Sequence, residues 1–367
     1  MVKDGDVMYR FGVFFRMFFS CAFIAILILG KTHAVDFSIS AQSAVLINPQ
    51  NNEIIFEHNA NQQLGMASTT KIMTAIVAIE NGDLDRKYII PSDAVGVEGS
   101  SLYLKEGEEM TLRELLIGLM LRSANDAAEA IAIIVGGSVE GFADMMNNKA
   151  DALGLKDTHF TNPHGLADSE HYTTAKELAF ISAYALKNAT FKSICSLSSA
   201  TLPGIEYSRQ VTNHNKLLYT YDGAYGVKTG FTKATGRCLV SAAKRNEIDL
   251  IAVTLNAPDD WKDHRTMLDY GFSLFEKVEL AKTGEFLCAV PIIGGDKNTL
   301  PIYFSENVSV CLKKSRGSIV QKIELNRPRF APIYEGDILG TVSYFIDEKL
   351  IYSLPIYSPT YIGKNKT

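Results

Sequence analysis

The stretch from Gly65 to Ile79, GMASTTKIMTAIVAI, carries one lysine at the head of an otherwise apolar helical pattern. Its apolar residues recur at helical spacing, which predicts a helix that opens at Ser68. Ser68 and Lys71 are three positions apart, so both side chains leave one helix face, about 5–6 Å apart at Cβ. A buried ammonium group is costly unless it is paired or neutralised. Either Lys71 points outward, or Ser68 and Lys71 form a site.

Two further polar fragments interrupt apolar segments. Ser123-Ala124-Asn125 breaks a helical pattern that runs from residue 112 to residue 137, and backbone that leaves helical geometry can turn side chains into a cleft. Lys228-Thr229-Gly230 lies in a strand pattern, and its glycine permits a ligand to approach the backbone closely. We expect these two fragments to face Ser68 and Lys71 across one cleft.

Each of the three patterns occurs a second time in the chain. Ser241 and Lys244 lie in a strand pattern, where an odd separation sends side chains to opposite faces. The fragment 305–307 (SEN) is typical of a polar turn, and the fragment 282–284 (KTG) of the end of a helix. Local geometry therefore favours the first copy of each pattern.

The order of elements divides the chain into two parts. Four segments with distinct hydrophobic periods come first: a strand pair over 43–61, helices over 68–188, three strands over 225–257 and a helix over 260–278. This order predicts one domain of mixed helices and strands over residues 36–277. Short alternating runs broken by Gly, Pro and Asn then predict a small β-sandwich over residues 280–367.

The first 34 residues are typical of a signal peptide. Arg10 and Arg16 precede an apolar run, and the small residues Thr32 and Ala34 precede a predicted cleavage point. The apolar run of about 14 residues is short for a membrane span. Residues 1–34 are therefore expected to direct export, with an uncleaved N-terminal anchor as the alternative.

Composition excludes several classes of function. The net charge of −5, without basic clusters, argues against nucleic acid as a partner. The five cysteines are widely spaced and form no CxxC pair, so redox chemistry has no support. His159, His164 and His171 share one loop without the spacing of metal ligands, which favours structural roles. We expect no metal and no cofactor.

The three fragments resemble the SxxK, SxN and KTG motifs of the penicillin-recognising serine transferases and hydrolases. The longer segments MASTTKIMTA, RSANDAAEAIA, MMNNKADALGLKDTHFTNPHGL and YGVKTGFT resemble the D-alanyl-D-alanine carboxypeptidases, which are low-molecular-mass penicillin-binding proteins. The resemblance runs from about Ser43 to Phe272. It implies an α+β fold of the β-lactamase/transpeptidase type, with an antiparallel sheet flanked by a helical cluster, followed by a small all-β sandwich domain.

The resemblance also implies a reaction. A serine-type carboxypeptidase would remove the terminal D-alanine from peptidoglycan stem pentapeptides through an acyl-enzyme on Ser68, and β-lactams would inhibit it covalently. Lys71 is expected to act as the base once it is neutral, because a serine hydroxyl is a weak nucleophile until its proton is taken. Ser123 is expected to relay a proton, and Asn125 to hold the lysine and the substrate amide.

Substrate binding is expected at the third fragment. A cation and a hydroxyl beside a small glycine suit a carboxylate, so Lys228, Thr229 and Gly230 are expected to bind the carboxylate terminus of the peptide. Thr232 is the next candidate along the strand.

The resemblance places the oxyanion hole at the backbone N–H groups of Ser68 and Phe231. Some relatives carry a substrate-binding arginine near the position of Trp261, and Arg265 is the nearest candidate here.

Two alternatives share these motifs. A class A β-lactamase adds a glutamate that activates the deacylating water, for which the chain offers Glu170. The second alternative is a catalytically poor penicillin-binding sensor or structural wall protein. The end of the chain has no helical period, so no C-terminal membrane anchor is expected. We expect an exported protein in the periplasm or at the outer face of the cytoplasmic membrane or cell wall.

Overall fold

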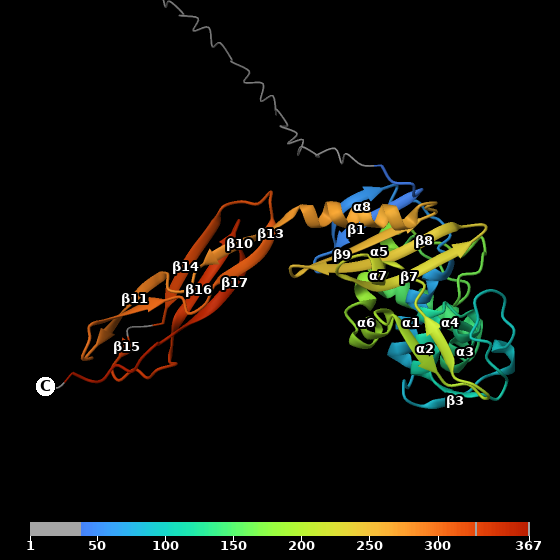
Figure 1. Ribbon diagram of the computed structural model, residues 1–367, viewed down its shortest axis with the longest axis horizontal. Helices are drawn as coiled ribbons and strands as arrows, with labels where there is room; N and C mark the ends of the chain where they lie inside the picture. The colour runs from blue at the N-terminus through green and yellow to red at the C-terminus, as the bar shows by residue number, and fades with distance from the viewer. Residues whose placement is uncertain (1–37, 327–328, 366–367) are drawn as a thin grey trace, which may run out of the picture. The chain divides into compact units, whose positions relative to one another are not determined.

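The computed structural model of the protein describes residues 38–326 and 329–365 (Figure 1). The predicted signal peptide, residues 1–34, lies outside these ranges. None of the helices in the described ranges has both the length and the apolar character needed to cross a bilayer.

A five-stranded antiparallel sheet, in the order β2-β1-β9-β8-β7, organises the chain before residue 274. Its strands are β1 (Ser43–Asn48), β2 (Glu53–His58), β7 (Ala224–Thr232), β8 (Gly236–Arg245) and β9 (Ile248–Leu255). Val45 of β1 pairs with Val253 of β9, so the predicted strand pair and the predicted strand triplet join into one sheet. Because β1 and β9 pair, the strands that precede and follow the helical segment in the sequence belong to the same domain as the helices between them.

Helices cover both faces of this sheet (Figure 1). Helix α8 (Asp260–Ser273) packs on one face, and α5 (Ala175–Ala185) with the short 3₁₀ turn η1 (Ala67–Thr70) packs on the other. Beyond them lies the helical cluster: α1 (Lys71–Asn81), α2 (Leu112–Leu121), α3 (Asn125–Gly136), α4 (Val139–Ala152), α6 (Ala189–Cys195) and α7 (Leu217–Thr220). The predicted α+β architecture is confirmed.

Local sequence explains where these helices begin and end. Thr111 and Glu114 form a capping box at the start of α2, in which each side chain pairs with the backbone of the other residue. Ser138 caps α4 by accepting a hydrogen bond from Gly141 N. Gly137 ends α3 with a φ of 78°, a left-handed conformation that glycine adopts without strain. These signals separate the helices that a continuous apolar pattern alone would merge.

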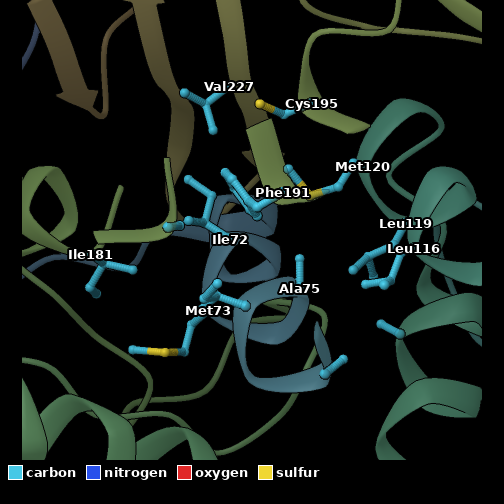
Figure 2. Packing of buried hydrophobic residues seen from close by; sticks show 14 of the residues in the cluster. Ile72, Met73, Ala75, Leu116, Leu119, Met120, Ile181, Phe191, Cys195 and Val227 are labelled. Carbon is cyan, nitrogen blue, oxygen red and sulfur yellow. The ribbon is translucent and has the colours of Figure 1, made fainter. Parts of the chain in front are cut away.

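Helix α1 forms the centre of the main hydrophobic core. Figure 2 shows its Ile72, Met73 and Ala75 among buried side chains of neighbouring elements: Leu116, Leu119 and Met120 of α2, Ile181 of α5, Phe191 and Cys195 of α6 and Val227 of β7. All of these side chains are at most 2% exposed. The apolar pattern in the stretch 65–79 is therefore the core-facing surface of one helix, and burial of that surface fixes where Lys71 lies.

Several short elements are absent from the sequence-based expectations. They are the paired strands β3 (Lys87–Ile89) and β4 (Glu109–Thr111), the paired strands β5 (Ser199–Leu202) and β6 (Arg209–Thr212), and the 3₁₀ turn η2 (Ser92–Ala94). Each pair has only three or four residues on a strand. Such strands are too short for an alternating pattern to stand out.

The chain after residue 274 is all-β, as predicted. Its strands are β10 (Phe275–Ala281), β11 (Phe286–Ile293), β12 (Thr299–Tyr303), β13 (Val308–Lys313), β14 (Ile319–Leu325), β15 (Arg329–Phe330), β16 (Ile338–Ile346) and β17 (Lys349–Tyr357). They form sheets of β10-β13, β12-β11-β15 and β14-β16-β17 around a second core that includes Leu339 and Tyr344.

Two expectations near this region are wrong. The helix predicted to run to residue 278 ends at Ser273, because Phe275 to Ala281 pair with β13 as strand β10. The fragment 282–284 therefore follows a strand, not a helix. Strand β10 also crosses the predicted boundary between residues 277 and 280, and the bounds of the two domains remain predictions.

Ile76 and Ile89 provide a matched test of the main core. Ile76 in α1 is 1% exposed, whereas Ile89 in β3 is 66% exposed. We expect Ile76→Ala to lower the free energy of unfolding by about 2–5 kcal/mol, because it leaves a cavity in the core. Ile89→Ala should change the same free energy by less than about 0.5 kcal/mol. Urea unfolding of both variants measures the difference, and equal losses would contradict the packing described here.

Candidate active site

Ser68 and Lys71 lie at the junction of two helical elements. Ser68 belongs to η1, and Lys71 is the first residue of α1. Residues three apart in a 3₁₀ turn lie above one another, and Lys71 Nζ is 3.1 Å from Ser68 Oγ. Ser68 is half-buried and lines a cleft, while Lys71 is fully buried. The two side chains share one face, as their spacing predicts.

The Lys71 amine has two carbonyl partners besides the serine. Its Nζ atom donates to Asn125 Oδ1 and to the His164 carbonyl oxygen, both at 2.7 Å. A neutral amine has two hydrogens and one lone pair, and a carbonyl oxygen only accepts. With both hydrogens directed at oxygens, the lone pair faces Ser68 Oγ. In its neutral form, Lys71 is therefore oriented to accept the serine proton.

Electrostatics favour that neutral form. Burial lowers the pKa of Lys71 well below the value of an ordinary lysine, and the nearby charge of Lys228 lowers the pKa further. The carboxylate of Asp126 opposes this shift by favouring the charged form. The site thus places two lysines in one buried region, where the charge of Lys228 disfavours protonation of Lys71.

The fragment 123–125 occupies the break between α2 and α3. Ser123 has a φ of 62°, in the left-handed region, and its side chain lines the same cleft as Ser68. Asn125 opens α3 and bridges two groups: its Oδ1 accepts from Lys71, and its Nδ2 donates to the Glu98 carbonyl at 2.5 Å. The strained turn at Ser123 therefore directs one side chain to the cleft and the next polar side chain to the lysine.

Asp126 is a residue that the sequence reasoning missed. It is 1% exposed, and its carboxylate accepts from Leu102 N, Leu104 N and Ser101 Oγ at 2.6–3.1 Å. These bonds hold the loop whose carbonyl groups contact Asn125. The signal was its place directly after Asn125 at the start of the apolar segment SANDAAEA, because an acidic residue that becomes buried requires partners.

Strand β7 forms the opposite wall of the cleft. Lys228 is 1% exposed and donates to the Thr229 carbonyl oxygen at 2.9 Å. Burial lowers the pKa of Lys228 to about 7. A Cβ atom on Gly230 would lie 3.0 Å from Ser68 N, so the glycine permits close contact between β7 and η1. The three fragments therefore converge, as expected.

Two of the remaining candidates on this strand differ in position. Phe231 is 63% exposed and lines the cleft, as do Thr229 and Gly230. The Thr232 hydroxyl instead lies 2.9 Å from Thr235 Oγ1 and accepts from Thr235 N at 3.0 Å, and Thr232 is not among the residues that line the cleft. Its side chain closes the turn between β7 and β8.

The cleft has a volume of about 790 Å³. Besides Ser68, Ser123, Thr229, Gly230 and Phe231 it is lined by Ser100, Thr212, Asn213, His214, Lys216, Tyr219, Arg237, Pro258, Asp260 and Trp261. Lys71, Asn125 and Lys228 are buried behind these residues and do not line the cleft. Arg237 donates to Asp260 Oδ1 at 2.9–3.0 Å, and its guanidinium lies over the Trp261 ring at 5.7 Å from the ring centre. It is the arginine of the cleft, whereas Arg265 donates to the Thr220 carbonyl and does not line the cleft.

Arg237 could have been found from strand register. It pairs with Phe231 across β7 and β8, directly beside the predicted carboxylate site. Proximity to Trp261 in the sequence instead favours Arg265, which lies outside the cleft.

The second copies of the motifs lie away from the cleft. Ser241 is buried beside His264, with 2.5 Å between Oγ and Nδ1, whereas Lys244 is exposed and pairs with Glu247. Their side chains point to opposite faces of β8, as predicted. Asn307 accepts a hydrogen bond from the backbone of Thr283, so the other two second copies contact each other in the all-β region.

The histidine loop contacts the site through one backbone carbonyl and one imidazole ring. His164 supplies a carbonyl to Lys71, and its ring lies 3.4 Å from Glu129. His171 lies 2.7 Å from Thr70 Oγ1. No group of His, Cys, Asp and Glu within residues 38–326 and 329–365 is arranged to hold a metal ion. Glu170 is exposed and does not line the cleft.

Comparison with known families gives two matches that together span most of the chain. The family model described as D-alanyl-D-alanine carboxypeptidase matches residues 30–259. The model described as the C-terminal domain of penicillin-binding protein 5 matches residues 275–364.

Individual proteins and solved structures agree with this assignment. The chain is 34% identical to the D-alanyl-D-alanine carboxypeptidase DacF of Bacillus subtilis, over 86% of this chain and 84% of that protein. It is 29% identical to DacA of Escherichia coli, over 87% and 82%. The structure is similar to penicillin-binding protein 5 from Haemophilus influenzae, with a TM-score of 0.63, 28% identity, and coverage of 89% of this chain and 99% of that one.

Lys228 gives this site a measurable pH dependence of stability. Its pKa is about 7 in the folded protein and near the ordinary 10.5 in the unfolded chain. Between these values the unfolded chain binds more protons, so stability rises with pH, by up to about 1.4 kcal/mol per pH unit for one group. We expect the wild-type protein to gain stability more steeply than Lys228→Met as pH rises above 7.

Urea unfolding at several pH values above 7 measures the two slopes. Lys187→Met, which removes an exposed lysine, should keep the wild-type slope. Equal slopes for the wild-type protein and Lys228→Met would show that Lys228 is charged and hydrated in the folded protein.

Proposed function

The chain belongs to the D-alanyl-D-alanine carboxypeptidase family, and we propose that it removes the terminal D-alanine of stem pentapeptides by serine catalysis at Ser68. The observation that carries this proposal is the set of three partners around Lys71 Nζ. The two amine hydrogens are donated to two carbonyl oxygens, so the nitrogen lone pair faces the serine hydroxyl. A buried base in contact with a serine is the arrangement that activates this nucleophile.

Acylation follows from this geometry. Neutral Lys71 takes the proton as Ser68 Oγ attacks the carbonyl carbon of the penultimate D-alanine. The N–H groups of Ser68 and Phe231 stabilise the oxyanion. The proton then passes to the leaving nitrogen, directly or through the Ser123 hydroxyl. The peptide bond breaks, an ester forms on Ser68, and D-alanine leaves with a free amine.

Deacylation regenerates the site. A water molecule attacks the ester carbon, Lys71 accepts one of its protons, and Ser68 Oγ leaves and recovers a proton. This step restores the Ser68 hydroxyl and releases a stem peptide shortened by one residue. Asn125 supports both steps because it holds the Lys71 amine by one bond and the loop at Glu98 by another.

Recognition of the carboxylate terminus is assigned to β7. Buried Lys228 supplies a positive charge, and Thr229, which lines the cleft beside Gly230, supplies a hydroxyl. Binding of an anion favours the protonated form of Lys228, which in turn favours neutral Lys71. Substrate binding therefore promotes the state of Lys71 that the reaction needs. Arg237 adds a second cation to the same wall.

The remaining proposals concern place and organisation. β-Lactams are ligands of this family of sites, and we propose that they acylate Ser68. Residues 1–34 direct export, so the enzyme acts in the periplasm or at the outer face of the cytoplasmic membrane or cell wall. Residues 36–277 form the catalytic domain, and residues 280–367 form the β-sandwich domain.

A Ser68→Ala variant tests the nucleophile. We expect it to lose release of D-alanine from diacetyl-Lys-D-Ala-D-Ala by at least about 10³-fold, because no other hydroxyl contacts the Lys71 lone pair. Covalent labelling by penicillin, followed by mass spectrometry, should disappear in parallel.

The matched control is Ser241→Ala, which removes the serine of the second SxxK copy. It should keep both activities in the folded protein. Penicillin labelling that persists in Ser68→Ala would refute the assignment of the nucleophile, and rapid release of hydrolysed penicillin by the wild-type protein would favour a β-lactamase instead.

A further inference from the structure

The residue before the nucleophile has an unusual backbone conformation. Ala67 has a φ of 47°, in the left-handed region, although it carries a side chain. Alanine rarely adopts this conformation unless surrounding contacts enforce it. Ala67 is 1% exposed, so those contacts come from within the protein.

A directed chain of hydrogen bonds reaches the Ala67 carbonyl. Thr161 N donates to His171 Nδ1 at 3.1 Å, which makes Nδ1 an acceptor and leaves the proton of the neutral imidazole on Nε2. His171 Nε2 then donates to Thr70 Oγ1 at 2.7 Å. The threonine hydroxyl has a single proton, and it donates that proton to the Ala67 oxygen at 2.8 Å.

The surroundings of His171 and Thr70 keep the donor and acceptor roles in these hydrogen bonds fixed. His171 and Thr70 are 4% and 1% exposed, so water does not compete for their bonds. The ring of Phe160 packs edge-on against His171, with 5.7 Å between ring centres. Burial lowers the pKa of His171 to about 4, so the neutral form persists at ordinary pH. Protonation of Nδ1 would set it against the Thr161 N–H group.

A glycine holds the same carbonyl from a second direction. A Cβ atom on Gly165 would lie 1.9 Å from the Ala67 oxygen and 2.7 Å from Thr70 Oγ1. Gly165 has a φ of 86°, and its N–H group donates to Asn162 Oδ1 at 2.7 Å. The loop backbone therefore lies directly against the Ala67 carbonyl, which is held between Gly165 and the Thr70 hydroxyl.

The peptide plane transmits this restraint to the nucleophile. The Ala67 carbonyl and the Ser68 N–H belong to one planar trans peptide unit, so they point in opposite directions. A restraint on the carbonyl therefore sets the direction of the N–H. Ser68 N faces the backbone of β7 at Gly230, on the side of the cleft where Phe231 supplies the other N–H group.

We propose that His171 is a positioning residue, which acts through Thr70 on the Ala67–Ser68 peptide unit and aims the Ser68 N–H at the developing oxyanion. This inference rests on the proposed function of Ser68. It assigns the histidine loop a part in acylation, although neither His171 nor Thr70 touches the substrate cleft. An N–H group stabilises an oxyanion only when it points at that oxygen. Misorientation of the Ser68 N–H group therefore lowers the rate of the chemical step more than the affinity for substrate.

Four variants separate this role from simple support of the fold. His171→Leu removes the donor, and His171→Gln places an amide nitrogen near the position of Nε2. Thr70→Val removes only the bridging hydroxyl and keeps the shape of the side chain, and Thr70→Ser restores a hydroxyl. We expect His171→Leu and Thr70→Val each to lower kcat and the rate constant of penicillin acylation by about 10- to 100-fold, with KM changed by less than about threefold.

Rescue and coupling are the decisive readouts. His171→Gln and Thr70→Ser should recover rates within about threefold of wild type. The double variant of His171→Leu with Thr70→Val should be no slower than either single variant, because both changes interrupt the same series of hydrogen bonds. If His171→Leu does not fold, the two Thr70 variants still decide the outcome.

His264→Leu is the matched control. His264 is a fully buried histidine between two hydroxyls, Ser241 Oγ at 2.5 Å and Thr254 Oγ1 at 3.0 Å, and it lies outside the cleft. Its loss should lower the melting temperature but leave the acylation rate of the folded protein unchanged.

Three results would overturn the proposal: wild-type acylation rates in folded Thr70→Val, failure of both rescue variants, or an equal rate loss in His264→Leu. Absence of acylation at Ser68 in the wild-type protein is a different result, because it would refute the proposed function itself.

Discussion

The structure of this site depends on the burial of one amine. Burial of the apolar face of α1 also buries Lys71, and a charged ammonium group is poorly solvated there. Two carbonyl oxygens and one hydroxyl satisfy the amine in its neutral form. The other parts of the site follow from this constraint: α3 must begin beside Lys71 to offer Asn125, and the loop before α5 must approach to offer the His164 carbonyl. Packing and chemistry are therefore inseparable at this position.

Much of the site could be predicted because its key relationships are local. The separation of Ser68 and Lys71 defines a shared face, and the polar interruption at 123–125 marks a helix break where side chains can leave the core. The same reasoning correctly separated Ser241 from Lys244. It failed after Ser273, where an apparently helical pattern pairs with β13 as a strand, since distant pairing overrides local preference.

The missed residues depend on contacts between distant segments. Leu102 and Asp126 are 24 positions apart, and Thr70 and His171 are 101 positions apart. Arg237 enters the cleft through the register of β7 against β8, which can be used only once these two strands are known to pair. The spacing of the three histidines favours structural roles over metal binding. Spacing alone does not show which backbone group a neutral histidine holds.

Gly165 connects the packing of the histidine loop with the position of the nucleophile Ser68. Its missing side chain leaves just enough room for the Ala67 carbonyl, so any larger residue there must displace the turn that carries the nucleophile. Residues 167–170 are exposed and have room for other side chains, whereas residue 165 has almost none. A chain with a side chain at this position would retain the three sequence motifs, so a motif search would not detect the displaced turn.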